Sequence, residues 1–207
     1  MKGRLSLLAA SFLSFLIVQA GWGELISFDN ITSAGGYTNE VAVTNGYGGL
    51  NWSGFDAVNA YLFNNKYSNT GVRNGMVSSS NVVCNAFGGL ATISSAGDFT
   101  VSNVDLSSCW LTGMSIGIKG YNGASLIDST TIVVNTTAPT LLNLDWQNIS
   151  SMTFTAFGGS NAGLGSTMET FVMDNLSVSV VPEPSAFLLV SVGLVALGSG
   201  LRRRSRR

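Results

Sequence analysis

The sequence predicts an all-β domain, built from two packed antiparallel sheets, between two terminal targeting segments. The middle of the 207-residue chain is rich in Gly, Asn, Ser and Thr and in β-branched and aromatic residues, and it contains few Lys and Glu. This composition favours strands and turns. Short apolar segments alternate with Gly, Asn and Ser clusters, and no long stretch has the 3.6-residue period of a helix, so a β-sandwich is expected.

Eleven segments fit strands: 24–28, 40–43, 57–63, 76–83, 91–93, 99–106, 115–120, 130–134, 140–144, 152–157 and 170–180. Met114, Ile116 and Ile118 fall on one face of their strand by the two-residue period. Asn122-Gly123 predicts a type I′ hairpin turn directly after it. Segments 45–53 and 157–166 are rich in small residues and are expected to form loops.

The charge of the middle region excludes some functions. Between residues 24 and 181, three basic residues stand against ten acidic ones, a net charge of -7. Such a body lacks the basic surface of a nucleic-acid-binding protein. The chain contains no histidine, which removes the commonest general base and metal ligand.

The N-terminal segment, residues 1–23, has the pattern of a signal peptide. Lys2 and Arg4 precede an uncharged run over 5–18, and Val18-Gln19-Ala20 provides a cleavage site after Ala20, with Gly23 as the second choice. A helix of about 14 apolar residues spans about 21 Å, short of a hydrocarbon core of about 30 Å. The pattern predicts export.

The C-terminal segment, residues 181–207, combines a short motif, an apolar run and a basic tail. Pro182-Glu183-Pro184 keeps the chain extended, and an uncharged run follows over 186–201. About 16 residues reach roughly 24 Å as a helix, which suits transient membrane insertion. The positive-inside rule keeps the tail cytoplasmic and places the body outside. The tail arginines are Arg202, Arg203, Arg204, Arg206 and Arg207.

This ordered triplet strongly resembles the PEP-CTERM sorting signal of Gram-negative bacteria. The resemblance implies cleavage near the motif by the transpeptidase exosortase, after signal peptidase has removed the N-terminus. It also implies transient anchoring in the inner membrane, then transfer to the cell surface or the extracellular polysaccharide of a biofilm. A simple C-terminal anchor would use the same residues. A Gram-positive sortase signal needs Leu-Pro-x-Thr-Gly, which is absent.

The body, residues 24–180, resembles the jelly-roll β-sandwiches of carbohydrate-binding modules in segments 47–52, 120–123, 134–139 and 171–176. That resemblance implies a structural calcium site in which Asp174 joins Glu24 or Asp29, because carboxylates and loop carbonyls suit Ca²⁺. The alternative is that Asp174 is a solvated polar residue. No other cofactor is expected.

Exposed aromatic rings can stack on sugars, and Tyr47 and Trp52, in a Gly-rich segment, are the preferred pair. Trp110, Tyr121 and Trp146 are further candidates. For each of these rings, packing in the core is the alternative.

Cys84 and Cys109 are the only cysteines. In an exported chain they can form a disulfide, and the alternative is a pair of buried thiols.

The sequence therefore predicts a non-enzymatic surface or matrix protein associated with exopolysaccharide. A calcium-dependent carbohydrate-binding module is the second reading. A glycoside hydrolase is the third, and it would require a shared cleft holding two carboxylates about 5 to 9.5 Å apart.

Overall fold

The computed structural model describes residues 23–32, 34–36 and 38–180. The predicted signal peptide and sorting segment lie outside these residues, apart from Gly23. Within the described part of the chain, no helix is long and apolar enough to cross a membrane. The strands are β1 Gly23–Ile26, β2 Val41–Ala42, β3 Asn51–Ser53, β4 Phe55–Asn59, β5 Asn81–Asn85, β6 Ala91–Ser108, β7 Leu111–Thr112, β8 Met114–Asn122, β9 Ser125–Val134, β10 Thr140–Phe157, β11 Ser160–Asn161 and β12 Phe171–Val180. The helices are η1 Tyr47–Gly49, α1 Ala60–Asn64, α2 Gly71–Asn74 and η2 Ala86–Gly88.

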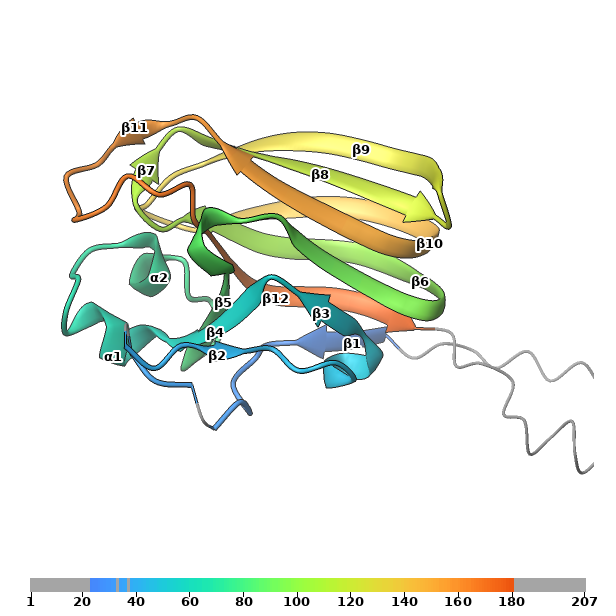
Figure 1. The fold of residues 1–207 in the computed structure, drawn as a ribbon, viewed down its shortest axis with the longest axis horizontal. Coiled ribbons are helices and arrows are strands. Elements are labelled where there is room, and N and C mark those ends of the chain that lie inside the picture. Colours follow the sequence, from blue (N-terminus) through green and yellow to red (C-terminus); the bar gives the residue numbers. More distant parts are fainter. Residues whose placement is uncertain (1–22, 33, 37, 181–207) are drawn as a thin grey trace, which may run out of the picture.

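Two long antiparallel strands, β6 and β10, join the two halves of the fold (Figure 1). Their register shifts beside Trp146 and Ile149, so the ladder is interrupted by bulges and can bend there. Beyond the bulges, the last part of β10 pairs with β8, which pairs with β9, and the first part of β6 pairs with β3. We call this half sheet I. On the other side of the bulges, β6 pairs with β12. From β12 the sheet continues through β5 and β4 to β2, and β1 also pairs with β12. We call this half sheet II.

The two sheets pack face to face through apolar side chains. Phe154 of sheet I lies 5.8 Å from Phe55 and 5.6 Å from Phe171 of sheet II, measured between ring centroids. Both pairs are in the range of favourable aromatic contacts. The predicted apolar face of β8 is confirmed, because Met114, Ile116 and Ile118 are fully buried. The all-β, antiparallel prediction is confirmed.

A third layer covers the outer face of sheet II, which the sequence did not predict. Residues 57–63 were expected to form one strand, but β4 ends at Asn59 and α1 begins at the next residue. The Asn59 side chain caps the helix by accepting a hydrogen bond from the Leu62 N–H at 3.1 Å. Likewise, the expected strand over 76–83 is confined to β5, and residues 76–80 lead from α2 to that strand.

Two pairs of segments that were predicted as separate strands each form one long strand. Segments 91–93 and 99–106 belong to the single strand β6, and segments 140–144 and 152–157 both belong to β10. The predicted hairpin joins β8 to β9, but Asn122 pairs with Ser125, so the loop residues are Gly123 and Ala124. Of these two only Gly123 has a positive φ, 57°, whereas a type I′ turn needs both. The hairpin is confirmed and the turn type was wrong.

Candidate functional site

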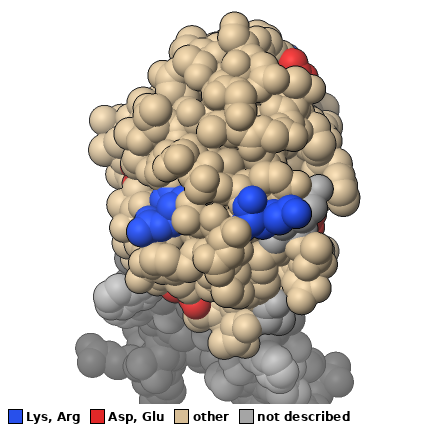
Figure 2. Space-filling model, turned by 90° about the vertical axis from the view of Figure 1, so that its left-hand side faces the viewer, with Lys and Arg blue, Asp and Glu red and all other residues tan. Residues whose placement is uncertain are grey.

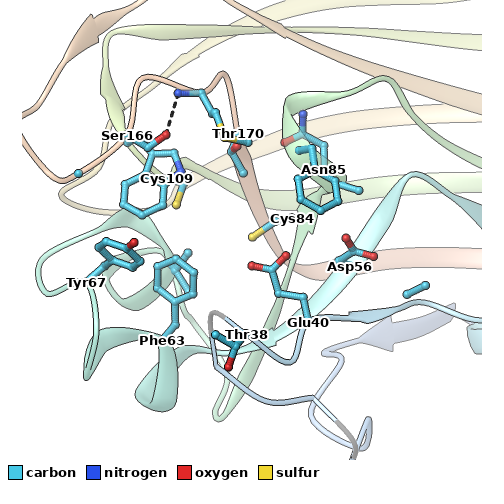
Figure 3. Close-up of a pocket in the computed structure, with 17 residues that line it drawn as sticks. Thr38, Glu40, Asp56, Phe63, Tyr67, Cys84, Asn85, Cys109, Ser166 and Thr170 are labelled. Atoms are coloured by element: carbon cyan, nitrogen blue, oxygen red, sulfur yellow. Dashed lines mark hydrogen bonds between the residues drawn. The ribbon is translucent and has the colours of Figure 1, made fainter.

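A cavity of about 640 Å³ lies on the outer face of sheet II, against α1, α2 and the segment that precedes β12. Figure 3 shows its lining: carboxylates, aromatic rings, two thiols and a threonine hydroxyl surround one space. The lining residues used below are Glu40, Asp56, Phe63, Tyr67, Cys84, Phe87, Cys109, Trp110 and Thr170.

Strand register builds the floor of the cavity. Ala42 pairs with Asp56, and Asp56 pairs with Cys84, so these three side chains form a row on one face of neighbouring strands. Glu40 stands two residues before Ala42 and shares that face. It is a diagonal neighbour of Asp56, a relationship that brings Cβ atoms within about 7 to 8 Å. Two acidic side chains from adjacent strands thus enter the same cavity.

The two carboxylates are partly removed from water and repel each other. Burial raises the pKa of Asp56 above its ordinary value. Burial is also the main cause that raises the pKa of Glu40, and the negative charge of Asp56 raises it further. Both shifts favour the neutral acid, since desolvation and a like charge penalise a carboxylate. A positively charged or hydrogen-bond-donating ligand would relieve this penalty.

Three aromatic side chains form one wall of the cavity. Phe63 lies in the last turn of α1, Tyr67 follows that helix in the chain, and Trp110 lies between β6 and β7. The Tyr67 and Trp110 rings meet edge to face at 5.1 Å, and Phe63 lies 5.7 Å from each of them. Phe63 and Trp110 are only 3% and 5% exposed, so the half-buried Tyr67 offers most of the ring surface that can contact the C–H groups of a sugar or a cation.

Thr170 contributes a buried hydroxyl to the cavity. Its side chain is only 7% exposed, and its Oγ1 atom has no hydrogen-bond partner. An unsatisfied hydroxyl in such a place costs about 1 to 3 kcal/mol. The neighbouring polar residue, Asn85, is fully engaged with the backbone of Gly89, Glu169 and Phe171. Thr170 therefore keeps an unused hydrogen-bonding capacity beside the cavity, and a ligand would reach the enclosed Oγ1 atom only after a small shift of the surrounding side chains.

Phe87 stands at the mouth of the cavity in a strained conformation. Its φ is 51°, in the left-handed region, and its side chain is 84% exposed. A bulky residue rarely adopts this conformation, and such strain clusters at functional sites. The ring is available to a ligand that enters the cavity.

The two cysteines line the cavity as free thiols. Burial is the main cause that raises the pKa of both thiols. Val172 of β12 pairs with Cys84 on one side and with Ser107 on the other, while the Cys109 N–H bonds to the Thr170 carbonyl. Strand β12 therefore lies between Cys84 and Cys109, and two strand spacings amount to about 10 Å. A disulfide needs Cα atoms within about 7 Å, so the predicted disulfide is not formed.

The preferred stacking pair lies elsewhere. Trp52 is 6% exposed and meets Phe28 and Phe55 edge to face, so it packs in the core. Its indole N–H donates to the Tyr47 carbonyl at 2.9 Å. Tyr47 is half-buried, stacks on Phe28 and lines a separate cavity of about 340 Å³. Trp52 therefore offers no open ring face to a sugar, in contrast to the prediction.

The other candidate rings divide between core and surface. Trp146 is buried in the core and Tyr121 is half-buried at the end of β8. Trp110 is also buried, but it is the one predicted aromatic residue that lines the larger cavity.

The predicted calcium ligands are engaged differently. Asp174 is fully buried, not solvated, and its carboxylate accepts hydrogen bonds from the backbone N–H groups of Val77, Ser78 and Asn175 and from the Ser78 hydroxyl. Asp29 accepts from the Asn81 N–H at 3.0 Å. Among residues 23–32, 34–36 and 38–180, no three acidic or cysteine side chains gather into a metal-binding group. The structure thus does not unite Glu24, Asp29 and Asp174.

Sequence reasoning did not single out Glu40, Asp56, Phe87 or Thr170. Their position depends on register between strands far apart in the chain, which the sequence does not display. One local signal was present: Phe87 is followed by two glycines, which favour a turn or loop at this position.

The cavity lies at the end of the molecule opposite the chain termini. Gly23 pairs with Ser179, so the first and last described strands run side by side, and both terminal residues lie at the right of Figure 1. Helices α1 and α2 lie at the left. Figure 2 views that end and shows a largely uncharged surface with two separate basic patches.

Comparison with known proteins identifies one family model, the PEP-CTERM protein-sorting motif, over residues 180–206. No curated protein matches the chain. Similar solved structures include TmCBM61 in complex with β-1,4-galactotriose, with 12% identity, coverage of 62% of this chain and 86% of that one, and a TM-score of 0.36. Another is the K1 cleaved adhesin domain of Lys-gingipain from Porphyromonas gingivalis W83, with 10% identity, coverage of 77% and 99%, and a TM-score of 0.45.

Proposed function

We propose that this chain, which carries a PEP-CTERM sorting motif, is an exported, non-enzymatic protein whose jelly-roll-like sandwich binds extracellular saccharide. Signal peptidase removes its N-terminus, and exosortase cleaves near Pro182-Glu183-Pro184 after transient anchoring in the inner membrane. The body then resides at the cell surface or in the polysaccharide matrix.

The composition of the larger cavity is the observation that carries the binding proposal. Saccharides are held by ring surface that contacts their C–H faces and by polar groups that bond their hydroxyls. The cavity combines Phe63, Tyr67 and Trp110 with the carboxylates of Glu40 and Asp56 and the unpaired Thr170 hydroxyl. A volume of about 640 Å³ lies within the range of small-molecule sites.

The position of the cavity supports the same proposal. The strands that lead into the two terminal segments meet at one end of the sandwich, where Gly23 pairs with Ser179. A membrane-held intermediate would therefore present the opposite end, with α1, α2 and the cavity, to the surroundings (Figure 1).

A glycan array tests the binding proposal, with the protein applied in calcium and in EDTA. We expect binding to some saccharide, equal in both buffers because hydrogen bonds already occupy the Asp174 oxygens. Phe87→Ala should weaken it about tenfold, whereas Phe157→Ala, an exposed phenylalanine outside the cavity, should not. Binding to no glycan would contradict the proposal. Loss of binding in EDTA would favour the calcium-dependent module.

Glycoside hydrolysis is the second candidate, because Glu40 and Asp56 share one cavity. A pair of carboxylates, one with a raised pKa, is the machinery of most glycosidases. Incubation of each bound oligosaccharide with the protein, followed by mass spectrometry, separates the candidates. Intact oligosaccharide supports a binding protein, and cleavage abolished by Glu40→Gln or Asp56→Asn would establish the enzyme instead.

A further inference from the structure

The charges that line the larger cavity all have one sign. Glu40, directly before β2, and Asp56 of β4 enter it, and among the described residues that line it there is no lysine or arginine. A uronic acid or a sulfated sugar would bring like charge against these carboxylates, which is unfavourable without a compensating cation. The electrostatics of the cavity thus select against acidic saccharides.

Two basic side chains make ring contacts near the aromatic wall but are not among the lining residues. The Lys66 Nζ atom lies 5.9 Å from the centroid of the Tyr67 ring, a cation–π contact at the edge of the aromatic wall. Arg73 stacks 4.6 Å from the Tyr61 ring, and Tyr61 does not line the cavity. Neither contact is an ion pair with Glu40 or Asp56, so both carboxylates are open to a positively charged ligand.

The aromatic wall also favours a positively charged ligand. Phe63, Tyr67 and Trp110 meet one another within 5.7 Å, and ring faces attract an ammonium group that carboxylates hold nearby. In Figure 3 the Glu40 carboxylate points into the space between Phe63 and Cys84, so an ammonium group there would face both ring and carboxylate. Burial, followed by the negative charge of Asp56, raises the pKa of Glu40, and a cation bound beside both carboxylates would oppose the second cause.

The Thr170 hydroxyl is the second, independent sign of a ligand. It is more than nine-tenths buried, belongs to the lining and has no partner for Oγ1. A saccharide hydroxyl can both donate to and accept from it. A sugar that carries an amine would use the hydroxyl, the rings and the carboxylates together, which a metal cation or a small amine is too compact to do.

We infer that the preferred ligand is a saccharide with free, protonated amino groups, such as a de-N-acetylated hexosamine oligomer. The inference rests on the proposed saccharide-binding function and specifies its ligand class. The ammonium group would lie against Glu40 and Asp56, a pyranose face against the aromatic wall, and a ring hydroxyl would bond to Thr170.

Isothermal titration calorimetry with three matched probes tests this inference: glucosamine oligosaccharides, their N-acetylated forms and oligogalacturonates. We expect the free-amine form to bind at least tenfold more tightly than the N-acetylated form, and the oligogalacturonate to bind least. Glu40→Gln and Asp56→Asn should each reduce the preference for the amine and leave affinity for the N-acetylated form nearly unchanged. Asp145→Asn, an exposed acid outside the cavity, serves as the control.

The outcomes separate this inference from the function on which it rests. Equal affinity for free-amine and N-acetylated probes, or a preference that survives both substitutions, would overturn the amine inference and leave saccharide binding intact. If the protein bound none of the three probes and no glycan of an array, both the amine inference and the saccharide-binding function would be overturned. Because Glu40 is exposed, Glu40→Gln should fold normally even if Asp56→Asn does not.

Discussion

Asp174 and Ser78, which lie 96 residues apart in the chain, are joined by two hydrogen bonds: the Asp174 carboxylate accepts from the Ser78 N–H at 2.9 Å and from its hydroxyl at 3.1 Å. The same carboxylate accepts from the Val77 N–H at 2.7 Å. Asp174 thus holds residues 77 and 78, which lie between α2 and β5, against β12, the central strand of sheet II. These contacts lie on the face of the sheet that also bears the cavity.

Replacing this carboxylate with an amide should destabilise the fold. In Asp174→Asn, one side-chain position becomes an N–H₂ group that faces backbone N–H donors, so buried donors lose their acceptor. We expect the free energy of unfolding to fall by about 1 to 3 kcal/mol, measured by urea denaturation at pH 7. Asp145→Asn, on the exposed side of β10, is the control and should change stability little. Equal stability of the two variants would contradict this role.

The same residue predicts a pH dependence. Burial raises the pKa of Asp174 to about 6, outweighing the hydrogen bonds that lower it. Between the ordinary value near 4 and 6, the folded state keeps a proton that the unfolded state has released, so this group's contribution to stability is lost as pH rises through that window. Urea denaturation at pH 4, 5, 6 and 7 should show Asp174→Asn losing more stability, relative to wild type, at pH 4 than at pH 7. A difference that is constant or grows with pH would contradict the raised pKa.

Close packing of α2 on β6 gives a third prediction. A Cβ atom on Gly71 would overlap the Ser108 carbonyl oxygen, which is backbone and cannot rotate away. Gly71→Ala should therefore lower the free energy of unfolding by about 1 to 3 kcal/mol or more. Gly117→Ala is matched to it, because the added Cβ would meet its nearest atom, in the Phe157 ring, at an ordinary 3.5 Å. Equal melting temperatures of the two variants would contradict this prediction, because they would show that α2 can move away from β6 at little cost.

The relation between the fold and the sorting segment gives a fourth prediction. Strand β12 ends at Val180 and pairs with β1, β5 and β6, so it is central to sheet II. A chain that ends at Val180 should keep the melting temperature of the full-length protein, since the proposed cleavage near Pro182 would have to leave a folded body. A chain that ends at Thr170 should show no cooperative unfolding transition. A folded protein of that shorter length would contradict the central place of β12.

The sequence predicted those features that depend on local patterns. Alternation placed Met114, Ile116 and Ile118 on the core face, and the glycine after Asn122 marked the hairpin. It could not predict the third layer. The sequence offered a calcium ligand or a solvated residue for Asp174, and only the tertiary structure places the segment around Ser78 over it. The cavity was hidden for the same reason: Glu40, Asp56 and Thr170 are brought together only by the pairing of β2, β4, β5 and β12.

Central to this account is that the cavity on the outer face of sheet II, and not the region of Tyr47 and Trp52, binds saccharide. NMR chemical-shift mapping, with the tightest oligosaccharide found on the array, tests this most directly. We predict the largest shifts at the backbone amides of Ala86, Phe87, Ser166 and Thr170. Shifts confined to the segment from Tyr47 to Trp52 or to the β8–β9 hairpin, or the absence of any shift at saturating saccharide, would contradict it.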